Sequence, residues 1–153
     1  MRANGMDSTV LLMGGTPEGP CRLKLAFLSA APNVSLRIVE SATETQAYLS
    51  GLDAYADRDG YPMPRLILVD LDVAQSTGLE VLQWVKAKPG LMQIPVIVLT
   101  STGESSDVDQ AYALGASSCL LKSTDQEATQ DLAKGIEAYA ALLAPDIGYA
   151  ARA

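Results

Sequence analysis

Three apolar runs in this sequence end in polar residues that could do chemistry together. Asp70 and Asp72 follow the run LILV, Thr100 ends the run VIVLT, and Lys122 follows the run SCLL. A carboxylate can attack a phosphorus atom, while an ammonium group and a hydroxyl group hold the phosphoryl oxygens as negative charge develops on them. If neighbouring strands bring these residues together, they suit the formation of an acyl phosphate on Asp70.

The elements that must position these residues follow a repeated strand–helix pattern. Apolar or alternating runs predict five strands, over residues 9–13, 34–40, 66–69, 94–100 and 118–121. A helical pattern follows each strand. Short connections between such units imply right-handed crossovers and a parallel sheet covered by helices on both faces. Ligands in these sheets bind at the carboxyl ends of the strands, where the four polar residues stand.

Several helix signals can be assigned along the chain. Thr16 is expected to cap the first helix, and Ser41 with Glu44 forms a capping-box pattern for the second. Ser123 or Thr124 is expected to cap the last helix. The apolar stripe of that helix predicts a buried face of four residues, Leu132, Ile136, Tyr139 and Leu143.

The composition is typical of a globular domain with a full hydrophobic core. The chain has 153 residues, of which 48% are hydrophobic and 19% are charged. No apolar run approaches the ~18 residues of a membrane span. The N-terminus lacks the apolar core of a signal peptide, so a cytoplasmic protein without a membrane anchor is expected. The net charge of -7 and the lack of a basic run argue against nucleic-acid binding.

The residue inventory also excludes several kinds of catalytic site. Histidine is missing from the sequence, which excludes a histidine-based zinc site, a serine–histidine triad and a role as phosphohistidine donor. The two cysteines, Cys21 and Cys119, form no metal-binding motif and are expected to be buried free thiols. Chemistry in this chain therefore depends on carboxylates, hydroxyl groups and lysine.

The first predicted strand ends in glycines rather than in charged residues. Residues 14–19 read GGTPEG, which matches neither the G-x-G-x-x-G dinucleotide loop nor the G-x-x-x-x-G-K-[ST] phosphate loop. Backbone N–H groups of Gly14 and Gly15, with those of the helix start, could attract an anion. The spacing gives no support to a nucleotide site.

The segments around the polar residues resemble those of response-regulator receiver domains (CheY-like). PRLILVDLDVAQSTGLEVLQWVK is similar to the segment that carries the phosphorylated aspartate, here Asp70, and a turn glycine, here Gly78. IPVIVLTS resembles the strand with the switch threonine or serine, here Thr100. ALGASSCLLKS resembles the segment with the lysine of the family, here Lys122.

The resemblance implies a fold, partners and a mode of action. The fold is a flavodoxin-like, doubly wound (βα)5 sheet with strand order 2-1-3-4-5 over residues 9–145, with flexible tails at 1–8 and 146–153. A long polar loop, expected over residues 51–64, resembles that of single-domain receivers that partner phytochrome-type histidine kinases. The expected partners are a histidine kinase or phosphotransfer protein and a downstream protein target. Output is then by protein–protein contact in a two-component phosphorelay, not by an enzyme activity.

The main departure from the family lies at the end of the first strand. Receivers usually have two acidic residues there that help to bind Mg²⁺, and here these positions are Gly14 and Gly15. Because Mg²⁺ is held by few carboxylates, their loss predicts weak Mg²⁺ binding, and no metal ligand is assigned. Asp72, and to a lesser degree Glu18, is a candidate replacement ligand.

Two further departures concern the switch that the resemblance implies. The aromatic residue that the family often has three positions before the lysine is here Cys119, so an aromatic side-chain movement is not expected at that position. The lysine is followed by Ser123, where receivers usually have proline.

Two versions of the receiver interpretation stay open. In one, Asp70 is phosphorylated with support from Thr100, Lys122 and Asp72. In the other, Asp70 is vestigial in a pseudo-receiver that signals by binding alone. An alternative from another class is a haloacid-dehalogenase-like phosphatase using Asp70 and Asp72, because LILVDLD also resembles the D-x-D motif of that family, although its nucleophile normally lies on the first strand.

The last helix carries more small apolar residues than one buried stripe needs. A homodimer or partner face formed by the last strand and helix is therefore a further expectation. Its candidate residues are four alanines, Ala133, Ala138, Ala140 and Ala141.

Overall fold

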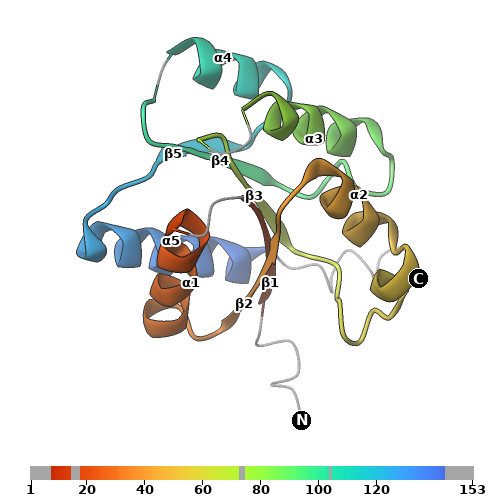
Figure 1. Ribbon diagram of the computed structural model, residues 1–153, viewed down its shortest axis with the longest axis horizontal. Coiled ribbons are helices and arrows are strands. Elements are labelled where there is room, and N and C mark those ends of the chain that lie inside the picture. Colours follow the sequence, from red (N-terminus) through yellow and green to blue (C-terminus); the bar gives the residue numbers. More distant parts are fainter. Residues whose placement is uncertain (1–7, 15–17, 73–74, 104, 144–153) are drawn as a thin grey trace.

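A parallel five-stranded sheet forms the centre of the structure, with helices on both faces (Figure 1). The computed structural model describes residues 8–14, 18–72, 75–103 and 105–143. The strand order is β2-β1-β3-β4-β5, and every neighbouring pair is parallel. The predicted doubly wound fold and strand order are therefore confirmed.

The strands lie close to the predicted runs. They are β1 (Ser8–Met13), β2 (Val34–Val39), β3 (Leu66–Asp70), β4 (Val96–Thr100) and β5 (Ser118–Leu121). β3 and β4 are buried along their whole length, as expected of central strands with continuous apolar runs. β2 is mostly half-buried, in keeping with its place at the edge of the sheet.

In the described part of the chain, an α-helix follows each strand. The helices are α1 (Glu18–Ala30), α2 (Ala42–Ser50), α3 (Gln75–Ala87), α4 (Ser105–Ala113) and α5 (Gln126–Leu142). α1 and α5 cover one face of the sheet, and α2, α3 and α4 cover the other (Figure 1). Because successive strand residues point to opposite faces, Leu12 packs in a core with Phe27 and Leu11 packs in a second core with Tyr48. None of the described helices is long and apolar enough to cross a membrane.

Helix α2 begins with the predicted capping contact. The Ser41 hydroxyl oxygen accepts a hydrogen bond from the Glu44 N–H (3.0 Å). The Glu44 carboxylate accepts its return bond from the N–H of Glu40 (2.9 Å), one residue before the cap. The helix ends at Gly51, whose φ of +70° favours glycine. Thr16, the expected cap of α1, lies outside the described residues.

The segment expected to be a polar loop contains a short 3-10 helix, η1 (Asp53–Ala56), and an aromatic cluster. The rings of Tyr48, Tyr55 and Tyr61 have centroids 4.9 to 5.9 Å apart. The Arg58 guanidinium donates hydrogen bonds to main-chain carbonyls of α2 and of Tyr61. These contacts order the chain that leads into β3, the strand that ends in the candidate site.

Helix α5 buries a face that agrees only in part with the predicted one, because Leu132 and Leu143 pack partly buried against the core and Tyr139 is 37% exposed. Its buried residues are Thr129, Ala133, Ile136 and Ala140. Of the four predicted residues, Ile136 alone is fully buried. The face is rotated because α5 packs beside α1, where small side chains allow a close approach. Ala133 and Ala140 therefore lie in the core and not on a partner surface, whereas Ala138 and Ala141 are exposed.

The cap of α5 also differs from the prediction. The Asp125 carboxylate caps the helix by accepting a hydrogen bond from the Ala128 N–H (2.9 Å). The predicted caps Ser123 and Thr124 are wrong. The Ser123 hydroxyl instead accepts from the Asp125 N–H (3.0 Å), so it orders the residue that does the capping.

Gly78 lies inside helix α3 and not in a turn. A Cβ atom at this position would lie 2.8 Å from Cγ1 of Val69 and 3.0 Å from Cδ2 of Leu71. The predicted turn role is therefore wrong. Gly78 lets α3 pack closely against β3, and it helps to fix the strand that carries Asp70.

Candidate functional site

The carboxyl ends of β3, β4 and β5 lie side by side at one edge of the sheet. Asp70 ends β3, Thr100 ends β4 and Lys122 follows β5. The register pairs Asp70 with Leu99 and Thr100 with Leu121. The main-chain N–H of Lys122 donates to the Thr100 carbonyl oxygen (2.9 Å). The predicted site residues therefore reach the same edge.

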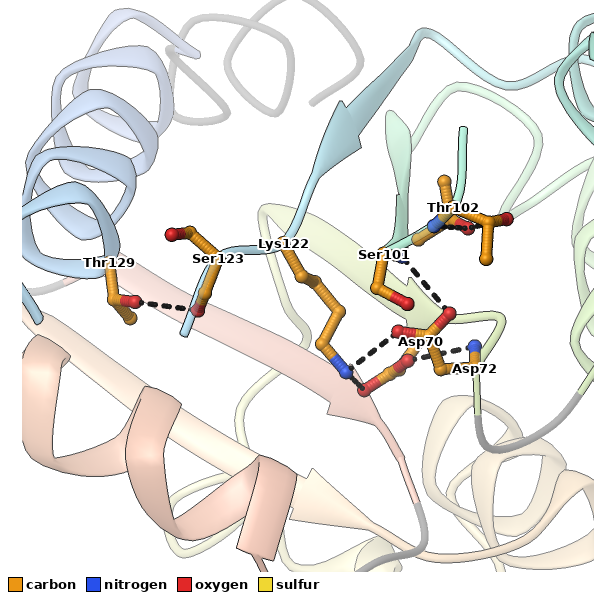
Figure 2. A network of polar contacts seen from close by, with 8 residues as sticks. Asp70, Asp72, Ser101, Thr102, Lys122, Ser123 and Thr129 are labelled. Atoms are coloured by element: carbon orange, nitrogen blue, oxygen red, sulfur yellow. Dashed lines mark hydrogen bonds and ion pairs between the residues drawn. The ribbon is translucent and has the colours of Figure 1, made fainter. Parts of the chain in front are cut away.

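Lys122 joins the two aspartates of the predicted site (Figure 2). Its Nζ lies 2.7 Å from Oδ2 of Asp70 and 3.2 Å from Oδ2 of Asp72. The Asp70 side chain is 1% exposed, whereas the Lys122 and Asp72 side chains are 19% and 25% exposed. Burying a carboxylate costs free energy unless its charge is paired, and Lys122 supplies that pairing for Asp70.

Asp72 bridges the ends of β4 and β5. Its Oδ1 accepts a hydrogen bond from the Ser101 N–H (3.0 Å), while its Oδ2 contacts Lys122. The Asp72 N–H in turn donates to Oδ1 of Asp70 (3.0 Å). An aspartate that accepts from the backbone two residues on forms a local turn. The side chains of Asp70, Asp72 and Lys122 therefore point toward one another (Figure 2).

Thr100 lies at this edge without joining the ion-paired cluster. Its side chain is 4% exposed, and its hydroxyl lies 3.4 Å from that of Thr102 and accepts from the Thr102 N–H (3.3 Å). Among the described residues, no hydrogen bond joins this hydroxyl to Asp70 or Lys122. Because a hydroxyl accepts two hydrogen bonds and donates one, the Thr100 hydroxyl can accept from Thr102 and still have a hydrogen to donate.

The contacts within the cluster shift two pKa values. Burial alone would raise the pKa of Asp72, but the Ser101 N–H and the Lys122 ammonium together hold the pKa below its ordinary value. Burial alone would lower the pKa of Lys122, but Asp70 and Asp72 raise the pKa above its ordinary value. The ion pair between Asp72 and Lys122 is therefore fully formed at neutral pH.

The neighbouring strand end contributes no carboxylate at Gly14. Met13 pairs with Val69 in parallel register, so Gly14 lies beside Asp70. Gly14 is buried, and its N–H donates to a carbonyl oxygen of β2 (3.1 Å). Gly15, the second position at which receivers usually have an acidic residue, lies outside the described residues.

The described residues are a poor ligand set for Mg²⁺. In this part of the chain, no group of three or more acidic, histidine or cysteine side chains is arranged to hold a metal ion. Asp70 and Asp72 are both paired with Lys122, whose positive charge opposes a nearby cation. The side chain of Glu18, the other candidate ligand, is not among those described. The described residues therefore do not fit a Mg²⁺ centre.

Cys119 lies on β5 as a half-buried free thiol, less buried than expected. Its main-chain N–H donates to the hydroxyl of Tyr112 on α4 (3.1 Å). Burial raises the pKa of the Cys119 thiol, and an interaction of the thiol with the Tyr112 hydroxyl offsets part of that rise. An aromatic ring thus reaches this position from α4 and not from β5. The side chain of Cys21 is outside the described set.

The Ser101 N–H is the contact that residue types did not predict. The sequence predicts Asp72 as a replacement ligand for Mg²⁺, whereas in the structure its two carboxylate oxygens contact the Ser101 N–H and the Lys122 ammonium. A backbone N–H donor is present at nearly every residue, so the residue types in a sequence do not show which N–H group forms such a contact. The only sequence feature that indicates this contact is the position of Ser101, which directly follows the end of a predicted strand.

Comparison with known proteins finds relatives among response regulators. A model of the response regulator receiver domain family matches residues 31–134. Response regulator Rcp1 of Synechocystis sp. is 34% identical over 93 residues, which are 61% of this chain and 63% of Rcp1. The probable methanogenesis regulatory protein FilR2 of Methanothrix harundinacea is 36% identical over 78 residues, which are 51% of this chain and 48% of FilR2. The matches thus span less than two thirds of these relatives.

Solved structures extend the likeness across most of the chain. The phosphorylated cyanobacterial phytochrome response regulator RcpA has a TM-score of 0.75 and 27% identity, and the match covers 86% of this chain and 91% of RcpA. The bacteriophytochrome response regulator AtBRR has a TM-score of 0.67 and 29% identity, with 84% and 93% covered.

The family match covers the segment that carries the candidate site. The matched segment includes Asp70, Thr100 and Lys122, and it begins beyond the glycines that end β1. The phosphatase alternative is not supported, because the matches are to receivers and Asp70 ends the third strand of the sequence. The chain belongs to the response regulator receiver domain family and is a CheY-like receiver of two-component signalling.

Proposed function

We propose that Asp70 accepts a phosphoryl group from a phosphorylated histidine of a kinase or phosphotransfer protein. Receiver domains are signalling proteins that work with histidine kinases in general. The observation that carries the proposal is the 2.7 Å contact between Lys122 Nζ and Asp70 Oδ2 at the end of the central strand. It joins a nucleophile to a cation that can hold the incoming phosphoryl oxygens.

The transfer requires one bond to form and one to break. An oxygen of Asp70 attacks phosphorus, the P–N bond to the donor imidazole breaks, and the imidazole nitrogen keeps the electron pair. The Lys122 ammonium then holds a phosphoryl oxygen and offsets its charge. The Thr100 hydroxyl, at the end of the neighbouring strand, is a candidate second donor.

A second candidate function is a pseudo-receiver that signals by binding alone. Gly14 favours it, because the strand end beside Asp70 has no carboxylate there to help hold a metal ion. The pairing of Lys122 with both aspartates favours it too, because an excess of negative charge repels a phosphoryl donor.

Intact-mass spectrometry after incubation with phosphoramidate separates the two candidates. Phosphoryl transfer predicts that the wild-type chain gains the mass of one phosphoryl group and that Asp70→Asn gains none. The incubation is run with and without Mg²⁺, and folding is checked by circular dichroism. A folded wild-type chain that gains no mass under either condition contradicts the phosphoacceptor role and leaves the pseudo-receiver.

A phytochrome-type kinase is proposed as the upstream partner. The support is the likeness to RcpA, described as a cyanobacterial phytochrome response regulator, and to AtBRR, described as a bacteriophytochrome response regulator. The proposed setting is the cytoplasm, and the proposed role is signalling without substrate turnover or nucleic-acid binding. Transfer of label from a phosphorylated phytochrome kinase to Asp70, faster than from an unrelated kinase, is the expected result.

Output is proposed to pass through the face formed by β5 and α5, as a homodimer or with a downstream protein. Leu142 and Tyr139 of α5 are 79% and 37% exposed. A groove of about 480 Å³ lies between the strand and the helix, lined in part by Leu120 and Leu132. Exposed apolar side chains beside a groove are typical of protein-binding surfaces.

A further inference from the structure

We propose that Asp72 is a built-in competitor for the phosphoryl group: its carboxylate occupies the donors that a group on Asp70 would need. This inference rests on the proposed phosphoacceptor role of Asp70. It changes the expected role of Asp72 from support of the site to control of access to it.

The contacts of Asp72 are those of a bound anion. One oxygen accepts from the Ser101 N–H (3.0 Å) and the other contacts the Lys122 ammonium (3.2 Å). The two donors come from the ends of β4 and β5, so the carboxylate spans the two strands. A phosphoryl group also presents negatively charged oxygens, and it is bound by the same kinds of donor.

The shared lysine makes the competition direct. Lys122 Nζ lies 2.7 Å from Asp70, so a phosphoryl group on Asp70 would come within reach of the same ammonium. The Asp72 carboxylate would then face a second anion at close range, and like charges at such distances repel. Either the Asp72 carboxylate moves away from Lys122, or the Lys122 ammonium binds the phosphoryl group more weakly.

The exposure of the two aspartates indicates which one moves. The Asp70 side chain is 1% exposed and is fixed between Lys122 and the Asp72 N–H. The Asp72 side chain is 25% exposed, so a rotation of its side chain can carry the carboxylate into water without uncovering the core. Release of Asp72 would free the Ser101 N–H and half of the Lys122 ion pairing.

Binding of inorganic phosphate tests the competition without requiring covalent transfer. The full chain is titrated with phosphate at constant ionic strength and neutral pH, and the Ser101 amide is followed by NMR. Asp72→Ala is expected to bind phosphate about tenfold more tightly than the wild type, since it frees a charge-assisted hydrogen-bond site. Asp72→Asn, which keeps the side-chain shape, is expected to change affinity in the same direction and replaces the alanine variant if that variant does not fold.

A matched variant separates a local effect from a change in net charge. Asp109→Ala removes one carboxylate from the exposed surface of α4, and it should stay within about twofold of the wild type because distant charges are screened. An equal gain from Asp109→Ala overturns the inference. So does an Asp72→Ala affinity no tighter than that of the wild type, including the case in which neither binds phosphate.

Phosphoramidate labelling of the same variants tests the competitor role of Asp72 separately from the phosphoacceptor role of Asp70. Faster labelling of Asp72→Ala, lost in the Asp70→Asn double variant, supports both. Tighter phosphate binding by Asp72→Ala with no labelling of any variant overturns the phosphoacceptor role, and Asp72 then competes only with a bound phosphate anion. Labelling of the wild type with no gain from Asp72→Ala in either assay overturns the competitor alone.

Discussion

Lys122 Nζ and Asp70 Oδ2 are 2.7 Å apart, although the two residues are 52 positions apart in the chain. The contact exists because β3, β4 and β5 end at the same edge of a parallel sheet. Asp70 is buried and Lys122 is partly buried, so the pair is shielded from water more than a surface ion pair. Its loss should affect both the stability of the fold and the chemistry of the site.

Removal of the lysine should destabilise the fold. Lys122→Met leaves the buried Asp70 carboxylate without its cation, and breaking such a pair from one side costs about 3 kcal/mol. Lys134→Met, the same substitution at an exposed position of α5, is the control and should change stability by less than about 0.5 kcal/mol. Urea unfolding measures both, and equal effects from the two variants would contradict the structural role of Lys122.

The contribution of Asp72 to stability should depend on pH. The pKa of Asp72 is lowered in the folded chain, so its ionised form stabilises the fold at every pH above its ordinary pKa of about 4. This stabilisation is lost as the pH falls through the lowered pKa of the folded chain. The free energy of unfolding of the wild type should therefore exceed that of Asp72→Asn by a constant amount from neutral pH down to about pH 5. The difference should then shrink on further acidification. A difference that does not change with pH would argue against the Asp72 ion pair.

Two helical glycines should respond to alanine in opposite directions. Gly78→Ala would bring a Cβ within 2.8 Å of Val69, and such overpacking costs about 1–3 kcal/mol. Gly135→Ala meets nothing within 4 Å on α5 and should stabilise the fold by up to about 1 kcal/mol. Urea unfolding measures the free energy of unfolding of both variants and of the wild type. If Gly78→Ala is as stable as the wild type, α3 does not need a close approach to β3.

Self-association should depend on the β5–α5 face. Tyr139→Glu replaces an aromatic side chain that lines the groove and is 37% exposed with a charged one, and it should weaken any dimer measured by sedimentation equilibrium. Leu52→Glu, at a position 55% exposed beside η1, is the matched control and should leave the association unchanged. A larger effect of Leu52→Glu would move the interface away from β5 and α5.

The fold could be predicted because apolar runs and breaks between them carry most of its information. β3 and β4 read as continuous β-branched and leucine runs, and their buried positions follow from that pattern. The approach of Asp70 to Lys122 then follows from topology alone. The burial of Thr129 and Ala140 on α5 could not be predicted in this way, because small side chains mark a buried face only when the neighbouring helix is known.

The finer structure of the site depends on choices that side-chain types do not encode. Ser123, Thr124 and Asp125 are all good caps, and the cap was decided by which residue the chain path brings to the Ala128 N–H. The role of the Ser101 N–H was hidden for a similar reason, since every residue near it offers the same donor.

The most direct test of the phosphoacceptor role is the position of the acyl phosphate. The chain is incubated with phosphoramidate and treated with borohydride, which reduces an aspartyl phosphate to homoserine, and the modified residue is located by peptide mass spectrometry. The phosphoacceptor role predicts homoserine at position 70 and at no other aspartate. Homoserine at position 72, or an unmodified Asp70 in a folded chain, would contradict it.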